Sequence, residues 1–320
     1  MTNSAWPDFN VAQWPGTKRT LHMYTQMLGK LRLALSPFQP NWMFTPLYFN
    51  ARGLTTGFIP WQWSSIEGTL DVLDSKITLA QSDGRAAEIA LLPARKVAEV
   101  FADVTGALEQ LGIDCYISPI PQEVPDTTPF NEDRRANEYD PEAVVRWFTA
   151  FTAANAVLET CRSHFFGRSG IQFWWGAFDV SLMFFSGKHV APPTDRGYLM
   201  KYDLDAELMN VGLFAGDEKT PPFFYGYIFP QPDDARNLAV KPAEASWSTQ
   251  LSEWVLPYDA VRSTRDPAAM LTAFVDSIYE HCFDAAGWNR DALTYAVPHR
   301  ARDARVENRA GRRQESDKEP

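Results

Sequence analysis

The sequence predicts an α+β protein, in which antiparallel strands form one or more sheets and helices pack on one face. Three observations point to this class. Strand-like runs are joined by short turns, as at Asp83-Gly84, and read as meanders. Helical periodicity is confined to a few long segments. The order helix, about four strands, helix occurs in the first half of the chain and again in the second.

The first half contains two predicted helices around a block of strands. Apolar residues recur at three- and four-residue steps over 20–35, which predicts a helix with one apolar face. Pro93 begins a second predicted helix and Gly112 ends it. A short strand is predicted over 114–120, before a Pro-rich, acidic loop. The strand-like runs between the helices span 45–53, 65–74, 76–84 and 86–93.

The second half repeats this order with longer loops. Asp140-Pro141 supplies a side-chain cap and a proline at a helix start, and Asp266-Pro267 begins the last helix in the same way. Strand-like runs between them span 171–193, 206–216, 222–231 and 252–261. Either an α–β4–α unit is duplicated, or one α+β sheet carries helices on one face. The predicted parts are an N-terminal arm (1–16), a first half (17–125), a second half packed on it (126–290) and a disordered charged tail (291–320).

Composition excludes several classes of partner. The 320 residues carry a formal net charge of −10, which disfavours attachment to nucleic acid or anionic lipid, so neither is an expected partner. The three cysteines are far apart and show no metal-ligand spacing, which favours a reduced cytoplasm and no metal. The first ten residues lack the pattern of an export signal. The sequence leaves cofactors and oligomeric state open.

Several phrases together resemble an uncharacterised bacterial family, a domain of unknown function. They are "TLHMYTQMLGKLRLALSP", "ARGLTT", "WGAFD" and "FSGKHVAPP", and the resemblance extends from about Trp14 to Trp288. Because that family has no established activity, the resemblance implies no catalytic residue.

The aromatic stretch 171–193 is the strongest candidate for a ligand site. Read as one continuous strand, its even positions form an apolar face for the core: Trp174, Phe178, Val180, Leu182 and Phe184. Its odd positions mix rings with a carboxylate and a hydroxyl: Phe173, Trp175, Ala177, Asp179, Ser181 and Met183. Such a mixed face is typical of a ligand cavity. The alternative is a turn over 176–179 that Asp179 merely caps.

Two other segments offer polar side chains. His22, Gln26 and Lys30 follow one stripe of the first predicted helix, and the ordinary pKa of His22 suits proton transfer near neutrality. The alternative is a structural histidine on a stripe facing solvent. The segment "NARGLTT" places Arg52, Thr55 and Thr56 at a strand end, where they would hold a carboxylate or phosphate; the alternative is that Arg52 pairs with a neighbouring acid.

The sequence therefore supports two functional hypotheses. In the first, the protein binds a small anionic or aromatic molecule in an aromatic pocket between strands and the first helix. His22 and Asp179 would be catalytic there, and the ligand-binding residues would be Gln26, Lys30, Arg52, Thr55, Thr56, Trp175 and Ser181. In the second, the protein is a non-catalytic interaction protein with an aromatic core, whose tail, with six Arg and one Lys against five acids from His299 onward, binds a partner.

Overall fold

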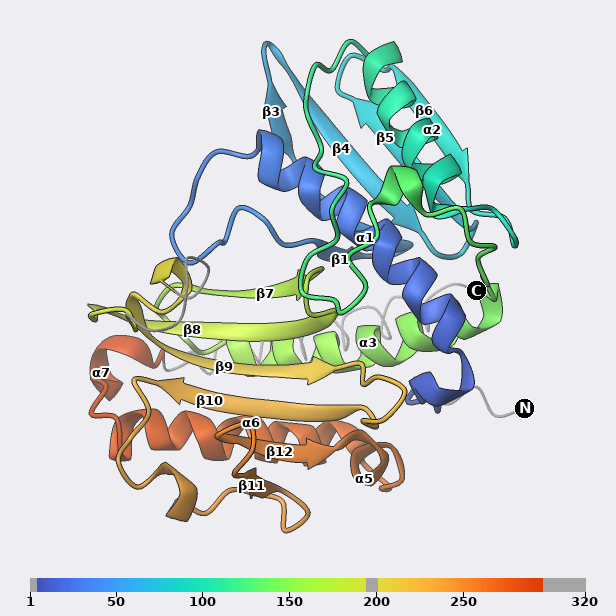
Figure 1. Cartoon of the computed structure of the whole chain (residues 1–320). Helices are drawn as coiled ribbons and strands as arrows, with labels where there is room; N and C mark the ends of the chain where they lie inside the picture. The colour runs from blue at the N-terminus through green and yellow to red at the C-terminus, as the bar shows by residue number, and fades with distance from the viewer. Residues whose placement is uncertain (1–4, 194–200, 296–320) are drawn as a thin grey trace, which may run out of the picture.

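The computed structural model describes residues 5–193 and 201–295, and within them two six-stranded antiparallel sheets with helices (Figure 1). The predicted α+β class with antiparallel sheet is confirmed. None of the described helices combines the length and apolar character needed to cross a bilayer.

The first sheet is built from the first third of the chain. Helix α1 (Pro15–Leu35) precedes it and α2 (Val97–Gln110) follows it. The sheet order is β1-β2-β4-β5-β6, and β3 pairs with the part of β4 that β2 leaves free. The strands are β1 (Tyr48–Asn50), β2 (Gly53–Thr55), β3 (Ile59–Trp61), β4 (Ser64–Asp71), β5 (Lys76–Gln81) and β6 (Ala86–Ala90).

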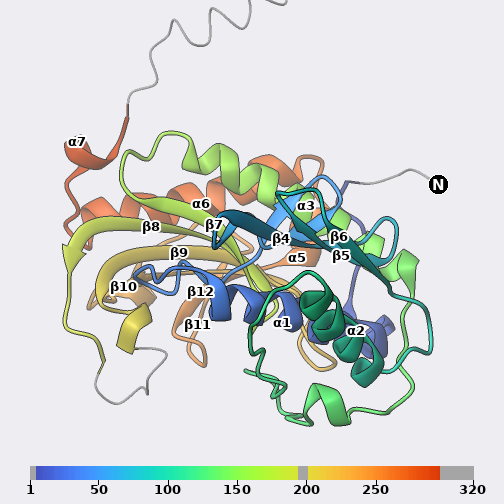
Figure 2. The ribbon, with the colours of Figure 1, turned by 90° about the horizontal axis from the view of Figure 1, so that it is seen from above.

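The second sheet has the order β11-β12-β10-β9-β8-β7. Helices α3 (Pro141–Arg162) and α6 (Pro267–Asp284) contact its central strands and lie along one face (Figure 2). The strands are β7 (Ser169–Trp174), β8 (Asp179–His189), β9 (Ala206–Phe214), β10 (Phe223–Phe229), β11 (Ser246–Ser248) and β12 (Glu253–Pro257). Short helices α5 (Tyr258–Arg262) and α7 (Arg290–Leu293) flank α6.

The two sheets are joined through the core. Leu47, just before β1, pairs its backbone with Phe173 of β7 through hydrogen bonds of 2.9 and 2.8 Å. Around this junction Phe49, Trp147 and Phe151 contact Phe173 at ring-centroid distances of 5.8–6.4 Å. The chain start also packs inward, since Phe9 lies edge-on to Tyr258 at 4.7 Å. One buried aromatic core therefore connects elements from both ends of the chain.

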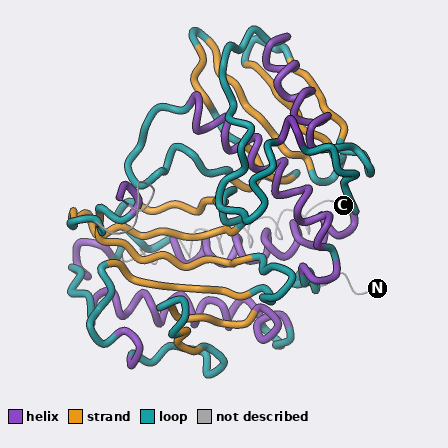
Figure 3. The backbone as a smooth tube through the Cα atoms, viewed as in Figure 1, coloured by secondary structure: helices purple, strands orange, loops and turns teal. Residues whose placement is uncertain are grey.

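One predicted strand is wrong and another is too long. Residues 114–120 form no strand and belong to the long loop between α2 and α3, which Figure 3 shows descending from the first sheet towards the second. Pro119 lacks an N–H for a ladder, and its carbonyl instead accepts from Phe130 N at 2.8 Å. The run over 252–261 is a strand only to Pro257, after which α5 begins. Of the predicted tail, residues 291–295 are described and include most of α7; the remainder lies outside the described residues.

The aromatic stretch forms a hairpin and not one continuous strand. A four-residue turn over 175–178 separates β7 from β8, with Phe178 at φ 61° and its N–H bonded to the Trp174 carbonyl at 2.8 Å. The predicted faces hold for β8, where Val180, Leu182 and Phe184 are buried in the core. They are reversed for β7, because Phe173 pairs with Val180 on the core side and Trp174 pairs with Asp179 on the other. The turn changes the alternation that a single strand would keep.

Candidate functional site

A cleft of about 690 Å³ lies on the face of the second sheet that α3 and α6 leave uncovered. Side chains of β7–β10 form its floor, and the end of α1, the α1–β1 loop, the α2–α3 loop and the segment before β9 form its walls. Its volume is in the range of small-molecule sites. The floor residues are Trp174, Asp179, Met183, Asn210 and Tyr225; the walls include Leu33, Phe38, Trp42, Phe44, Thr45, Gln122, Glu123, Trp175, Tyr202 and Asp203.

The floor follows from strand alternation and one glycine. Asp179, Ser181 and Met183 project from β8 on the same side, and Ser181 lies opposite Gly212 of β9, which in turn lies opposite Tyr225 of β10. A Cβ at Gly212 would lie 2.5 Å from the Tyr225 hydroxyl and 2.5 Å from the Val180 carbonyl oxygen. Gly212 therefore leaves the space through which Tyr225 reaches across β9 to Asp179.

We expect Gly212→Ala to destabilise the protein by about 1–3 kcal/mol, because the added methyl overpacks the sheet and displaces the Tyr225 hydroxyl from Asp179. Urea unfolding would measure the change. Gly106→Ala is the matched control, since Gly106 lies in α2 and a Cβ there would meet no atom within 4 Å. That substitution should leave stability unchanged or raise it slightly, because alanine favours a helix. A Gly212→Ala protein as stable as the wild type would contradict the assigned packing.

Asp179 is the most unusual group in the cleft. Its side chain is buried, the Tyr225 hydroxyl donates to Oδ2, and Oδ1 has no hydrogen-bond partner among the residues that the structure describes. Burial raises the pKa of Asp179 to about 7; the Tyr225 hydrogen bond opposes this rise and the negative charge of Glu123 adds to it. A carboxylate in this state can accept a proton or a ligand donor near neutral pH.

Two further carboxylates line the same cleft. Burial raises the pKa of Asp203 to about 6, with additional repulsion from Glu123 and Asp205, and burial raises the pKa of Glu123. Neither side chain makes an ion pair with any residue in the described ranges. The described lining residues include these three acids and no Lys, Arg or His. The described lining of the cleft therefore concentrates negative charge without a counter-ion of its own.

Aromatic rings form much of the remaining surface. Trp42 stacks on Phe44 at 5.8 Å and meets Tyr202 edge-on at 6.3 Å. Trp175 is fixed by a hydrogen bond from Nε1 to the Thr45 carbonyl at 3.0 Å, and Trp174 by one to Ser181 Oγ at 3.0 Å. Because their N–H groups are already bonded, the two indoles offer the cleft mainly their π faces and edges.

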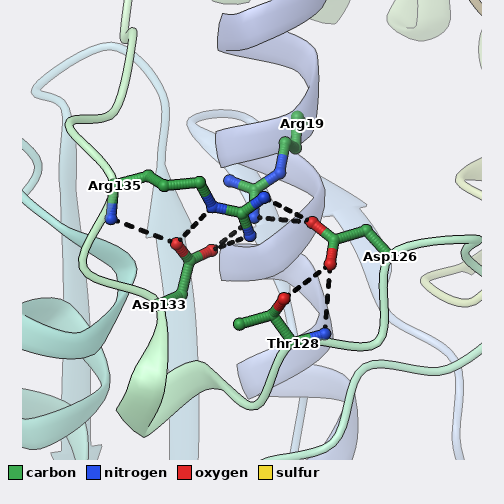
Figure 4. Close-up of polar contacts among 5 residues, drawn as sticks. All are labelled: Arg19, Asp126, Thr128, Asp133 and Arg135. Carbon is green, nitrogen blue, oxygen red and sulfur yellow. Dashed lines mark hydrogen bonds and ion pairs between the residues drawn. The ribbon is translucent and has the colours of Figure 1, made fainter.

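An ionic network holds the loop that carries Glu123. Asp133 binds Arg19 of α1 and, at 2.8 Å, Arg135; Asp126 binds Arg135 at 2.7 Å and accepts from the Thr128 hydroxyl at 2.7 Å (Figure 4). Burial would raise the pKa of Asp133, but hydrogen bonds from Arg135 and Arg19 outweigh it and lower that pKa. The network ties residues 126–135 to α1.

Next to this network, Gln26 fixes the loop tip. Its amide donates to the Gln122 carbonyl and accepts from Gln122 N–H, both at 2.8 Å. The following residue, Glu123, then lies against the hairpin turn, since a Cβ at Gly176 would meet its carboxylate oxygen at 2.1 Å. Residues far apart in the sequence thus place Glu123 beside Trp175 and Gly176.

Comparison with known proteins gives a family but no activity. A model described as a family of unknown function (DUF5996) matches residues 6–295. The chain belongs to this family. No curated protein and no solved structure matches the chain. The predicted resemblance to an uncharacterised family is therefore confirmed, and the site has to be interpreted from its own chemistry.

Of the predicted catalytic pair, Asp179 lines the cleft and His22 does not. His22 Nε2 lies 2.8 Å from the Trp175 carbonyl oxygen and 3.0 Å from that of Gly176, so Nε2 carries a proton and donates. Burial lowers the pKa of His22 to about 3, and the charge of Lys18 adds to this effect. A neutral histidine fixed in this way supports the hairpin turn from behind.

Some of the other predicted ligand residues line or support the cleft, and the rest lie away from it. Trp175 lines the cleft, and Ser181 and Gln26 support residues that do. Lys30 lies behind the wall, 5.6 Å from the Trp175 ring centre, where burial lowers its pKa to about 8. Arg52 pairs with Asp71 and, at 2.7 Å, with Asp74, while Thr55 and Thr56 are bonded within the first sheet. The structure therefore gives Arg52, Thr55 and Thr56 no place in the cleft.

Among the cleft residues that sequence reasoning missed are four polar ones that matter most for the site: Glu123, Asp203, Asn210 and Tyr225. Asn210 and Tyr225 had a usable signal, because each is a polar interruption of a strand-like apolar run, as Asp179 is. Glu123 and Asp203 lie in loops, where an acid is unremarkable until the fold brings it beside other acids.

Proposed function

We propose that this protein binds a small organic cation with an apolar or aromatic body in the cleft above β7–β10. The observation that carries the proposal is the meeting of three carboxylates without a cationic partner, Glu123, Asp179 and Asp203, inside walls made largely of aromatic rings.

The carboxylates favour a positive ligand. Grouping acids in a partly desolvated cleft costs free energy, which is expressed in the raised pKa values of Asp179 and Asp203. A bound cation would relieve that cost by supplying the missing counter-charge. The sequence predicts a small anionic or aromatic ligand, and the anionic alternative loses its support because Arg52 is paired elsewhere and no basic side chain is among the described lining residues.

The rings favour an organic ion over a hydrated metal ion. Aromatic faces attract cations and also remove the apolar part of a ligand from water. Trp42, Phe44, Trp174 and Trp175 supply such faces along the walls and floor. The interaction-protein hypothesis depends on a tail whose residues 296–320 lie outside the described part of the chain, and no described contact favours it.

Benzylamine, which stays protonated across neutral pH, is a suitable probe for calorimetric titration, with benzyl alcohol as the neutral control. We expect the amine to bind and its affinity to rise roughly tenfold or more between about pH 5.5 and about pH 8. The sign follows from the groups that titrate: Asp203 at about 6 and Asp179 at about 7 become negative over this range and attract the cation.

Other titratable groups near Asp179 and Asp203 are Glu123, Asp205, Glu253 and two tyrosines, Tyr225 and Tyr227, whose raised pKa values keep them neutral over this range. Burial raises the pKa of Glu253 to about 7, so its ionisation acts in the same direction. Lys30, with a pKa of about 8, loses charge at the upper end of the range and also favours the cation there. Equal binding of benzylamine and benzyl alcohol at every pH would exclude a cation site.

A further inference from the structure

We propose that the cationic end of the ligand carries N–H donors, as a primary ammonium or guanidinium group does, and is not a fully alkylated nitrogen. This inference rests on the proposed function and narrows its ligand class.

Aromatic walls alone do not distinguish these two kinds of cation. The attraction between a ring face and a positive charge needs no N–H, and quaternary ammonium ions are bound in this way. The choice therefore depends on the polar atoms of the cleft, and on which of them already have partners.

Asp179 supplies the first such atom. A carboxylate can accept about four hydrogen bonds. The Tyr225 hydroxyl uses Oδ2, while Oδ1 is buried and has no partner among the described residues; the residue as a whole is 6% exposed. A buried acceptor without a donor is costly, and an ammonium or guanidinium N–H would satisfy it with a charge-assisted bond. A trimethylammonium group would bring charge to the same place and leave Oδ1 unsatisfied.

Asn210 supplies a second atom of the same kind. It lies opposite Met183, and so four residues along the floor from Asp179, roughly 13 Å at the rise of an extended strand. Its Nδ2 donates to the Tyr227 hydroxyl at 3.2 Å, and its Oδ1 is buried without a partner in the described part of the chain. Both unpartnered floor atoms are oxygen acceptors, so the floor as a whole matches a ligand that donates hydrogen bonds.

The test compares benzylamine with benzyltrimethylammonium, which share a ring and a charge and differ in N–H donors. Calorimetric titration at about pH 8 is expected to show the amine binding about tenfold tighter, the equivalent of one charge-assisted hydrogen bond. In Asp179→Asn the preference should fall to about threefold or less, because the charged acceptor is gone.

Glu253→Gln is the matched control. Glu253 is a half-buried acid on this sheet that also has a raised pKa, but it does not line the cleft, so the substitution should leave the preference unchanged. Benzyltrimethylammonium binding as tightly as the amine, or a preference that survives in Asp179→Asn, would overturn this inference and leave the proposed function standing. Failure of both cations to bind better than benzyl alcohol would instead contradict the proposed function.

Discussion

Replacing Asp179 by Asn is expected to stabilise the protein above neutral pH, by on the order of 2–4 kcal/mol, although it removes a group central to the proposed site. The ordinary pKa of an aspartate is 3.8, and burial raises that of Asp179 to about 7. Ionising it in the folded protein therefore costs about 4 kcal/mol, at 1.36 kcal/mol for each pKa unit. The new amide is itself buried, which offsets part of the gain.

The pH dependence gives this prediction its sign. Below about pH 4 the carboxyl is protonated in both the folded and the unfolded chain, so its ionisation contributes nothing to the difference. As the pH rises from about 4 to about 7, the unfolded chain ionises while the folded one resists, and the wild type loses stability relative to Asp179→Asn. Above about 7 the difference is complete and constant.

Urea unfolding of both proteins at about pH 4.5 and about pH 8 would measure this difference. Glu67→Gln is a control acid, because Glu67 lies on an exposed position of β4 and accepts from Thr55. A destabilisation by Asp179→Asn of equal size at both pH values would mean that the carboxylate is a structural acceptor for Tyr225 and not a strained functional group.

The same substitution is expected to weaken benzylamine binding roughly 10- to 100-fold at about pH 8, the equivalent of one hydrogen bond to a charged partner. Gained stability together with lost affinity is the pattern of a group retained for binding at the expense of folding. Calorimetric titration of the same samples would measure this loss of affinity. The control Glu253→Gln should bind benzylamine with an affinity much closer to that of the wild type.

The sequence could predict the part of the site that depends on the alternation of side chains along a strand. Along β8 the odd residues Asp179, Ser181 and Met183 face away from the core, as the period of a strand requires. Across the turn the same rule gave the wrong side for Trp174, because the number of residues in a turn decides which face the next strand presents. Nothing in the apolar run itself marks where that turn begins.

The sequence could not predict which residues from distant parts of the chain lie next to one another. The helical stripe of His22, Gln26 and Lys30 is real, but whether it borders the cleft or supports its wall depends on the position of the α2–α3 loop, about 100 residues away. Arg52 finds Asp71 and Asp74 through strand pairing, which turns a candidate anion site into a local ion pair. The acids at 123 and 203 meet only because two separate loops converge over the sheet.

The ionic network in Figure 4 holds the loop that brings Glu123 to the cleft, and Asp133→Ala tests how much the stability of the protein and the position of this loop depend on it. The Asp133 side chain is 1% exposed and pairs with Arg19 and Arg135, whose side chains are 31% and 52% exposed. Removing the carboxylate breaks both pairs, but both guanidinium groups keep Asp126, at 3.3 Å from Arg19 and 2.7 Å from Arg135, and can also turn to water. We therefore expect a loss of about 2–3 kcal/mol, less than for a fully buried pair.

Binding should fall as well, although Asp133 does not line the cleft. Because the Asp133 pairs are part of the network that anchors the loop carrying Gln122 and Glu123, their loss should loosen Glu123 and weaken benzylamine binding several-fold, with faster amide hydrogen exchange at these two residues. Asp103→Ala is the matched control, since Asp103 pairs with Arg95 at 2.6 Å on the exposed side of α2. Unchanged affinity and exchange in a destabilised Asp133→Ala protein would mean that the Gln26–Gln122 bonds and the remaining Asp126 pairs position Glu123 without Asp133, which then stabilises the fold without shaping the site.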